Sequence, residues 1–287
     1  MPELPEVETV RRGLVRLKGK KVKEVFRSEK NLRIESTENL HKLIGTTITD
    51  IERRARYLII HFNNNHSLIV HLGMSGRVTM GEFEKLKHDH FACEFEGEFE
   101  DGEWLIFNDT RRFGFVDLLK TNNLEKHKML AKLGPEPVQI DDKIEDEFDF
   151  KYLKEKLRNK KMNIKTTMMD NEIVVGVGNI YISESLFDAK ISPLRNANEL
   201  SDKEIKTLIS SIKKTIKKAI DLGGSSISDY VNSEGDLGYF QNTLKVYGRE
   251  GENKNDETAG KCLLCKSLIR KIKQNGRSSF YCPQCQK

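Results

Sequence analysis

The stretch PELPEVETVRRGLVRL, residues 2–17, decides how the chain begins to fold. Pro5 suits the first turn of an α-helix, because an N–H at that position has no partner within the helix. Apolar residues then recur at helical spacing, at Val7, Val10, Leu14 and Leu17. We therefore expect a helix that buries one face and anchors the N-terminal segment.

The same stretch carries candidate chemistry. Removal of Met1 would leave Pro2 with a free secondary amine, and an α-amino group titrates near 8, so part of it is nucleophilic at neutral pH. Attack of this amine on an aldehyde or acetal carbon would give an iminium, and Glu3 and Glu6 lie within about one helical turn to move protons. The alternative is that Pro5 only starts a helix and the acids only favour its dipole.

The next part of the chain indicates β-structure. Segments rich in apolar or alternating residues follow one another at 48–62, 67–80, 91–99 and 104–107. Turn signals separate them, namely the asparagine cluster at 63–65 and Asp101-Gly102. Cys93 falls in an alternating segment, which is typical of a small buried apolar residue. We expect a β-rich domain up to about residue 130.

After residue 130 the pattern becomes helical. Gly134-Pro135-Glu136-Pro137 and the acidic stretch to Asp149 indicate a linker. One helix is expected from about Gly178-Asn179 to Phe187. Ser201-x-x-Glu204 forms a capping-box pattern before a long amphipathic helix that ends at Gly223-Gly224. Residues 224–242 are rich in Gly and Ser and are expected to form a mobile loop.

Four of the five cysteines form the pattern Cys262-x2-Cys265 and Cys282-x2-Cys285. This spacing is typical of a four-cysteine zinc ribbon, and it predicts one structural Zn²⁺ with no open coordination position. Two disulfides are the alternative, but they require an oxidising compartment, and the sequence shows no export signal.

Composition narrows the classes of function. The formal net charge is +5, and residues 261–287 contain seven Lys or Arg and no Asp or Glu. A one-signed segment favours contact with a phosphate backbone. The sequence has no run of 18 apolar residues, which argues against a membrane protein. Because the sequence shows neither an export signal nor a membrane span, we expect a cytoplasmic protein.

Several motifs occur in a defined order along the chain: PELPEVE (2–8), RRARYL (53–58), HLGMSG (71–76), RRFG (111–114), VVGVGNIYISESLF (174–187), FQ…VYGR (240–249) and YCPQCQK (281–287). Together they resemble the bacterial formamidopyrimidine-DNA glycosylase family over essentially the whole chain. The resemblance implies an α+β multidomain fold. Its parts would be an N-terminal β-sandwich with an N-terminal helix (1–130), a linker (131–148), a helix–two-turn–helix domain (149–244) and a β-hairpin zinc finger (245–287).

The resemblance also implies catalytic roles. Pro2 would be the nucleophile on C1′ of the damaged nucleotide, Glu3 the acid for ring opening, and Glu6 a positioning carboxylate. Arg56 stands where the family usually has a lysine tied to β-elimination, and Arg277 would take part in the second elimination. The implied activity is removal of 8-oxoguanine and formamidopyrimidines from duplex DNA, followed by β,δ-elimination.

Further positions would bind damaged double-stranded DNA. Three side chains would enter the duplex where the base has left, at Met74, Arg111 and Phe113. The others would contact DNA, mainly at phosphates: His71, His90, Lys160, Lys165, Asn179 and Tyr247. Each of these residues alone is also compatible with an ordinary core or surface role.

The chain departs from the family pattern at three places. Besides Arg56, Thr166-Thr167 replaces an expected proline and bulky residue, and 251–261 is a longer polar lead into the first cysteine pair. Two alternatives stay open. One is the related endonuclease VIII branch, which prefers oxidised pyrimidines but usually has Gly where this chain has Leu4. The other is a zinc-ribbon DNA-binding protein without catalysis.

Overall fold

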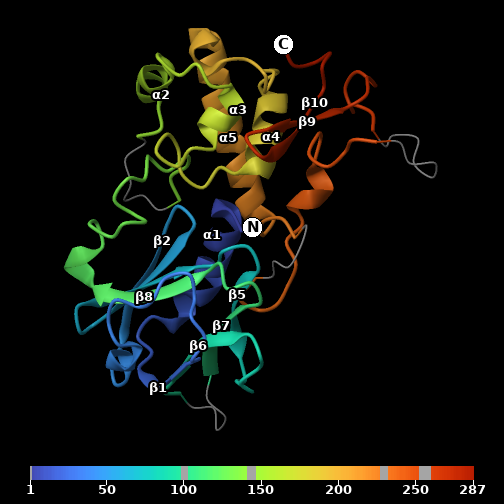
Figure 1. Cartoon of the computed structure of the whole chain (residues 1–287). Helices are drawn as coiled ribbons and strands as arrows, with labels where there is room; N and C mark the ends of the chain where they lie inside the picture. The colour runs from blue at the N-terminus through green and yellow to red at the C-terminus, as the bar shows by residue number, and fades with distance from the viewer. Residues whose placement is uncertain (1, 98–102, 141–146, 227–231, 252–259) are drawn as a thin grey trace. The chain divides into compact units, whose positions relative to one another are not determined.

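The computed structural model describes residues 2–97, 103–140, 147–226, 232–251 and 260–287. The chain divides into an N-terminal unit, Met1–Ala131 with Leu222–Tyr239, and a C-terminal unit, Lys132–Asp221 with Phe240–Lys287 (Figure 1). The family resemblance implied a helical domain at 149–244, which would include 222–239, and a separate zinc finger at 245–287. In the structure 222–239 belong with the N-terminal unit, and the helices and the finger form one unit.

The N-terminal unit contains one α-helix and two antiparallel four-stranded sheets, with strand orders β1-β6-β7-β5 and β2-β3-β4-β8. Its elements are α1 (Leu4–Leu14), β1 (Val22–Arg27), β2 (Ile48–Arg54), β3 (Tyr57–Phe62), β4 (His66–His71), β5 (Gly76–Gly81), β6 (Asp89–Phe95), β7 (Glu103–Asp109) and β8 (Phe115–Lys120), with short 3₁₀ turns at Val15–Leu17, Leu40–Leu43 and Thr121–Asn123.

Both sheets and α1 contribute to one apolar core, which makes the unit a β-sandwich with a helix packed on it. Val10 and Leu14 of α1, Phe107 of β7, and Leu58 and Val70 of the second sheet belong to this core. Cys93 is buried there as well, as its alternating pattern predicted. The expected fold class is confirmed for this half of the chain.

Two of the segments that were expected to form strands are each divided into two strands by a turn. The segment 48–62 reverses between β2 and β3, where Ala55 takes a left-handed φ of +54°. The segment 67–80 breaks between β4 and β5, where Gly73 has a φ of +63°. The expected turn at Asp101-Gly102 lies outside the described residues.

The described residues at 222–226 and 232–239 include contacts to α1, through Ser225, and to β5, through Ser233. Ser233 is buried, its carbonyl accepts a hydrogen bond from the N–H of Met80 at 2.9 Å, and a Cβ on Gly13 would lie 1.9 Å from its Oγ. The expectation of a mobile loop at 224–242 stays a prediction, and the described residues of that segment make the contacts given above. Residues 227–231 lie outside the described part of the chain.

The C-terminal unit is built from helices and one hairpin. Its elements are α2 (Phe150–Leu157), α3 (Ile164–Met168), α4 (Asn179–Asp188), α5 (Asp202–Asp221), β9 (Arg270–Gln274) and β10 (Arg277–Tyr281), with 3₁₀ turns at Ala197–Glu199 and Phe240–Thr243. The capping box is present: the Ser201 N–H donates to Glu204 Oε2 at 2.8 Å, and the Glu204 N–H donates to Ser201 Oγ at 3.4 Å. The two expected helices are thus α4 and α5.

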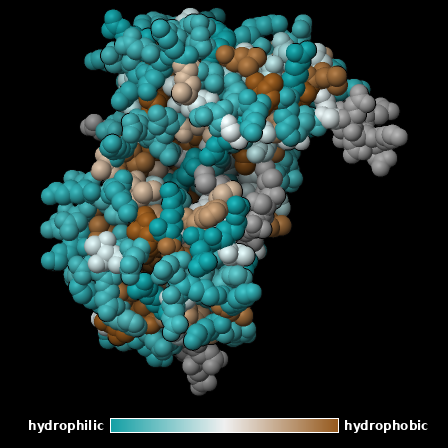
Figure 2. Space-filling view, in the orientation of Figure 1, coloured by the Kyte–Doolittle hydropathy of each residue, from teal (hydrophilic) through white to brown (hydrophobic). Residues whose placement is uncertain are grey.

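The face seen in Figure 2 is mainly hydrophilic, with small apolar groups scattered over it. Among the described residues, the helices are all too short or too polar to cross a lipid bilayer.

Candidate functional site

The N-terminus of α1 gathers the first three candidate residues. Pro2, Glu3 and Glu6 are buried, and Pro5 lies in the first turn of the helix. Glu3 is the N-cap residue and forms a capping box with Glu6, whose Oε2 accepts the Glu3 N–H at 2.7 Å. The acids therefore do start the helix, as the structural alternative required, and this role also fixes them beside Pro2.

Glu6 has a second backbone partner from far along the chain. Its Oε1 accepts the N–H of Ser225 at 2.7 Å. Gly224, at a φ of +82°, passes so close that a Cβ there would lie 2.9 Å from Oε1 of Glu6. Both oxygens of Glu6 thus receive backbone donors, which suits a positioning role.

Glu8, in α1, forms an ion pair that holds the turn before Arg56. Glu8 is 1% exposed and pairs with Arg53, whose Nε lies 3.2 Å from its Oε2. Burial would raise the pKa of Glu8, but hydrogen bonding by Arg11 and the charge of Arg53 outweigh it and lower this pKa. Arg53 Nη1 also donates to the carbonyl of Ala55 at 3.0 Å. The left-handed turn before Arg56 is therefore held by a buried ion pair.

His71 ends β4 next to Arg56. Its ring stacks on Phe115, with centroids 5.5 Å apart, and lies 5.0 Å from the ring of Tyr57. Burial, together with the positive charges of Arg56 and Arg33, lowers the pKa of His71 from 6.5 to about 4. The ring is therefore neutral at neutral pH. Its Nδ1 accepts the Gly73 N–H at 3.2 Å, which leaves Nε2–H as the donor available to a ligand.

Two neighbouring loops, 72–75 and 110–114, carry exposed side chains. Met74 is 40% exposed and Phe113 is 45% exposed. Arg111 is also exposed, and its guanidinium lies 4.9 Å from the centroid of the Phe113 ring. Large apolar side chains with this exposure are not core residues. The three predicted duplex-inserting residues thus come together at one place on the N-terminal unit.

His90 contacts the residue that precedes the loop 110–114, and it is 2% exposed. Its Nδ1 is 3.0 Å from Ser28 Oγ, and its Nε2 is 2.9 Å from the Asp109 carbonyl oxygen. Both ring nitrogens are therefore used by protein groups. A direct contact between His90 and DNA stays a prediction, and the geometry shows a supporting role for the ring.

In the C-terminal unit, Lys165 joins the start of α4 to the hairpin. It is 1% exposed, and its Nζ donates to Asn179 Oδ1 at 2.5 Å, to the Ser278 carbonyl at 2.9 Å and to Ser279 Oγ at 2.7 Å. Asn179 Nδ2 donates to the same Ser278 carbonyl at 3.0 Å. Lys165 is thus the least accessible of the expected phosphate ligands, and its visible role is to hold Asn179 against β10.

The remaining expected DNA ligands differ in exposure. Arg277 and Lys160 are exposed. Arg277 begins β10 directly after the turn at Asn275-Gly276, where both residues have positive φ. Tyr247 is half-buried, with its ring 4.8 Å from that of Phe280. Arg277 therefore projects from the hairpin tip, whereas Tyr247 is fixed against the base of the hairpin.

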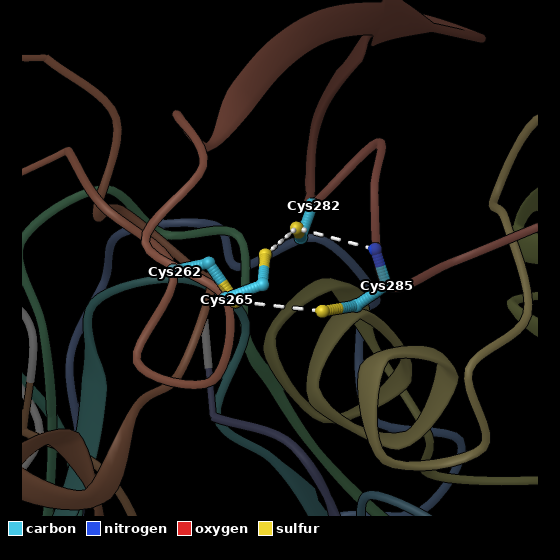
Figure 3. Close-up of side chains that lie close together, drawn as sticks. All are labelled: Cys262, Cys265, Cys282 and Cys285. Atoms are coloured by element: carbon cyan, nitrogen blue, oxygen red, sulfur yellow. Dashed lines mark hydrogen bonds between the residues drawn. The ribbon is translucent and has the colours of Figure 1, made fainter.

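The zinc ligands converge as the spacing predicted. The Sγ atoms of Cys262, Cys265, Cys282 and Cys285 lie within 4.8 Å of one another, from the two knuckles seen in Figure 3. Two of these S···S distances are 3.4 and 3.8 Å, too long for disulfides. Zn–S bonds of about 2.3 Å in a tetrahedron place sulfurs about 3.8 Å apart. The donor set and geometry fit one structural zinc bound by four thiolates.

Sequence reasoning missed several residues that hold the site together. Glu8 and Glu184 lie inside quoted motifs, but no role was assigned to them. Glu184 is buried, and its carboxylate accepts the backbone N–H groups of residues 245–247 at 2.8–3.0 Å, which fixes this irregular segment, including Tyr247. A charged residue at an otherwise apolar helix position was the available signal.

Comparison with known proteins agrees with this geometry. Residues 1–116 match the model of the formamidopyrimidine-DNA glycosylase N-terminal domain, 133–231 that of the H2TH domain of the same enzyme, and 260–287 that of the zinc finger found in FPG and IleRS. The formamidopyrimidine-DNA glycosylase of Rickettsia bellii (strain OSU 85-389) is 48% identical over 291 residues, with 100% of both chains covered.

Two crystal structures of Lactococcus lactis Fpg are similar over 100% of both chains. A complex of the wild-type enzyme with DNA containing N7-benzyl-Fapy-dG has a TM-score of 0.84 and 38% identity. A complex with DNA containing an oxidised pyrimidine has a TM-score of 0.83 and 38% identity. The chain therefore belongs to the formamidopyrimidine-DNA glycosylase family and is a DNA repair glycosylase with a C-terminal zinc finger.

Proposed function

We propose that the protein is a bifunctional DNA glycosylase and AP lyase that excises oxidised purines, namely 8-oxoguanine and formamidopyrimidines, from duplex DNA. The observation that carries the proposal is the placement of Pro2 directly before two buried carboxylates, Glu3 and Glu6, at the start of α1. Once Met1 is removed, Pro2 supplies a secondary amine in a site where its protonation can be controlled.

The first half of the reaction removes the base. The Pro2 nitrogen attacks C1′, the N-glycosidic bond breaks, and its electron pair leaves with the base, which takes up a proton. The nitrogen then loses its proton and its lone pair opens the C1′–O4′ bond to form the iminium. O4′ receives a proton from Glu3. Glu6 keeps the start of the helix and Ser225 in place through its two backbone hydrogen bonds.

The second half cleaves the strand. A proton is removed from C2′, and the electron pair of that C–H bond moves toward the iminium to give an enamine, which expels the 3′ phosphate as the C3′–O3′ bond breaks. Removal of a C4′ proton from the conjugated iminium then drives the second elimination, in which the C5′–O5′ bond breaks and the 5′ phosphate leaves. Arg56 binds a phosphate near C1′ and stabilises the departing 3′ phosphate by charge. Arg277, exposed at the hairpin tip, holds the phosphate that leaves in the second elimination. A guanidinium keeps its proton, so neither arginine acts as a proton donor.

Binding uses both units. Met74, Arg111 and Phe113 enter the duplex from the minor groove and occupy the space of the extruded nucleotide. Of the other predicted ligands, His71, Lys160, Asn179 and Tyr247 contact the DNA backbone. His90 and Lys165, which are buried and bonded to protein groups, act on the DNA through the residues that they hold in place. The start of α4 adds the positive end of a helix dipole beside Asn179. The protein acts as a monomer on double-stranded DNA at the bacterial nucleoid.

A second lesion class has a specific observation in its favour, since a Lactococcus lactis relative was crystallised with DNA containing an oxidised pyrimidine. Leu4-Pro5 at the start of the chain instead supports the oxidised-purine branch. Matched duplexes carrying 8-oxoguanine, a formamidopyrimidine or an oxidised pyrimidine separate these possibilities by their rates of free-base release. Fastest release of the pyrimidine would reassign the lesion class.

Borohydride trapping tests the chemistry itself. Reduction of the iminium should cross-link the wild-type protein irreversibly to an abasic duplex. Pro2→Gly, or a protein that retains Met1, should trap far less. Undiminished trapping by the protein with a blocked N-terminus would reject Pro2 as the nucleophile. No cross-link at all with the wild type would reject the Schiff base and with it the lyase half of the proposal.

A further inference from the structure

The Asp109 carboxylate lies between the two loops that carry Met74, Arg111 and Phe113. Asp109 ends β7 and has 0% exposure. Ser75 Oγ donates to its Oδ1 at 2.6 Å, and the Gly114 N–H donates to its Oδ2 at 2.8 Å. One oxygen therefore holds the loop of Met74, and the other holds the far end of the loop of Phe113.

A third donor closes this network. The Arg111 N–H points at Ser75 Oγ, 3.1 Å away, and at Asp109 Oδ1, 3.2 Å away. Arg111 is thus tied to both loops through its backbone, while its guanidinium is exposed. The carbonyl of Asp109 is itself fixed by His90 Nε2 at 2.9 Å.

Backbone packing makes the two loops one body. A Cβ on Gly73 would lie 2.4 Å from the Gly114 nitrogen, and a Cβ on Gly114 would lie 2.5 Å from the His71 carbonyl oxygen. The loops touch through main-chain atoms with no room for side chains between them. Displacement of one loop must therefore move the other, unless the Asp109 bonds break first.

We propose that Asp109, through Ser75, is a positioning residue that presents Met74, Arg111 and Phe113 to the duplex as one preformed wedge. This inference rests on the proposed function, in which these three side chains occupy the space that the extruded base leaves. A preformed wedge matters because its ordering cost is met during folding and not during base extrusion. Asp109 itself touches no DNA in this arrangement.

Two conservative variants test the proposal. Asp109→Asn keeps the shape of the side chain but replaces one acceptor oxygen by an NH₂ group, which faces a donor in either orientation. Ser75→Ala removes the hydroxyl that links Asp109 Oδ1 to the loop of Met74. Loss of a hydrogen bond to a charged group corresponds to roughly a tenfold to hundredfold change in an equilibrium constant. We expect about a tenfold slower base excision in each variant.

The readout is the ratio of two rates on otherwise identical duplexes. One is base excision from the lesion that the wild type removes fastest, and the other is borohydride trapping on a preformed abasic site, where no base has to be replaced. Asp117→Asn is the matched control. Asp117 is 1% exposed and accepts the Thr37 N–H at 2.6 Å, but it holds no wedge residue.

The proposal predicts that the excision-to-trapping ratio falls about tenfold in Asp109→Asn and Ser75→Ala and stays unchanged in Asp117→Asn. Combining Asp109→Asn with Met74→Ala should add little to Met74→Ala alone, because both act through the wedge. An unchanged ratio in a folded Asp109→Asn, or in Ser75→Ala if the first variant unfolds, would overturn the inference. A wild type that excises no lesion would instead overturn the proposed function, and this inference with it.

Discussion

Glu6 accepts a hydrogen bond from the backbone N–H of Ser225 at 2.7 Å, although 219 positions separate the two residues. The other oxygen of Glu6 holds the N–H of Glu3, also at 2.7 Å. One carboxylate therefore fixes both the start of α1, beside Pro2, and the segment 222–239 that returns to the sandwich. Disturbing that segment should affect the amine of Pro2 through Glu6.

Alanine substitutions at two adjacent glycines, Gly223 and Gly224, test whether this segment affects Pro2 through Glu6. Gly224→Ala would place a Cβ 2.9 Å from Glu6 Oε1, whereas a Cβ at Gly223 has its nearest neighbour at 3.7 Å. Both have positive φ, so alanine costs about 1 kcal/mol of backbone strain at either position. We expect Gly224→Ala to slow borohydride trapping at least about fivefold relative to Gly223→Ala, given about 1 kcal/mol for a displaced carboxylate hydrogen bond. Equal trapping by the two variants would contradict the coupling.

His71 should make stability depend on pH. Its pKa is about 4 in the folded protein and 6.5 when unperturbed, so the unfolded chain binds the extra proton between these values. The contribution of neutral His71 is complete above pH 6.5 and is lost as pH falls towards 4, by up to about 3 kcal/mol. His71→Gln should flatten the unfolding free energy over this window, measured by urea titration, while exposed His41→Gln should not.

Lys165 and Lys160 should separate structure from DNA binding. Lys165→Met leaves three acceptors without their ammonium donor and should lower the free energy of unfolding by about 3 kcal/mol. Lys160→Ala removes an exposed charge and should change stability by less than about 0.5 kcal/mol. It should instead lower the slope of log K against log salt by about one. A stable Lys165→Met protein would show that its buried bonds contribute little.

Residue type and spacing were sufficient for the parts of the fold with strong local signals. The apolar spacing after Pro5, the capping box at Ser201 and the four-cysteine pattern each correspond to an observed helix or knuckle. These features depend on contacts within a few residues. Ordered motifs then carried the family assignment, since no single motif specifies a sandwich.

Long-range polar contacts could not be derived in the same way. The bond between Asp109 and Ser75 spans 34 positions, and that between Glu6 and Ser225 spans 219. A buried carboxylate looks the same in sequence as an exposed one until its partners are placed. Exposure also separated residues that motifs treated alike, because Lys165 is buried and Lys160 is not.

Loss of the zinc site should destabilise the C-terminal unit and leave the N-terminal unit folded. Cys282→Ser removes one of four thiolates, so zinc content should fall well below one per chain, and hydrogen exchange of β9 and β10 should accelerate. The N-terminal unit should keep its protection. Cys93→Ser is the control, because it buries a hydroxyl in the sandwich core, at a cost of about 1–3 kcal/mol, and should leave one zinc bound. Full zinc occupancy in Cys282→Ser would exclude Cys282 as a ligand.

Arg56 should set the balance between base removal and strand cleavage. A guanidinium clamps a phosphate with two hydrogen bonds but keeps its proton, whereas a lysine ammonium can also donate one when its pKa is lowered. We therefore expect nicked strand to lag behind free base in the wild type, and Arg56→Lys to shorten that lag. Arg54→Lys, two residues earlier at the end of β2, is the matched control and should leave the lag unchanged. Simultaneous release of base and nick in the wild type, with no effect of Arg56→Lys, would reduce Arg56 to a phosphate clamp and assign the proton transfers to Glu3.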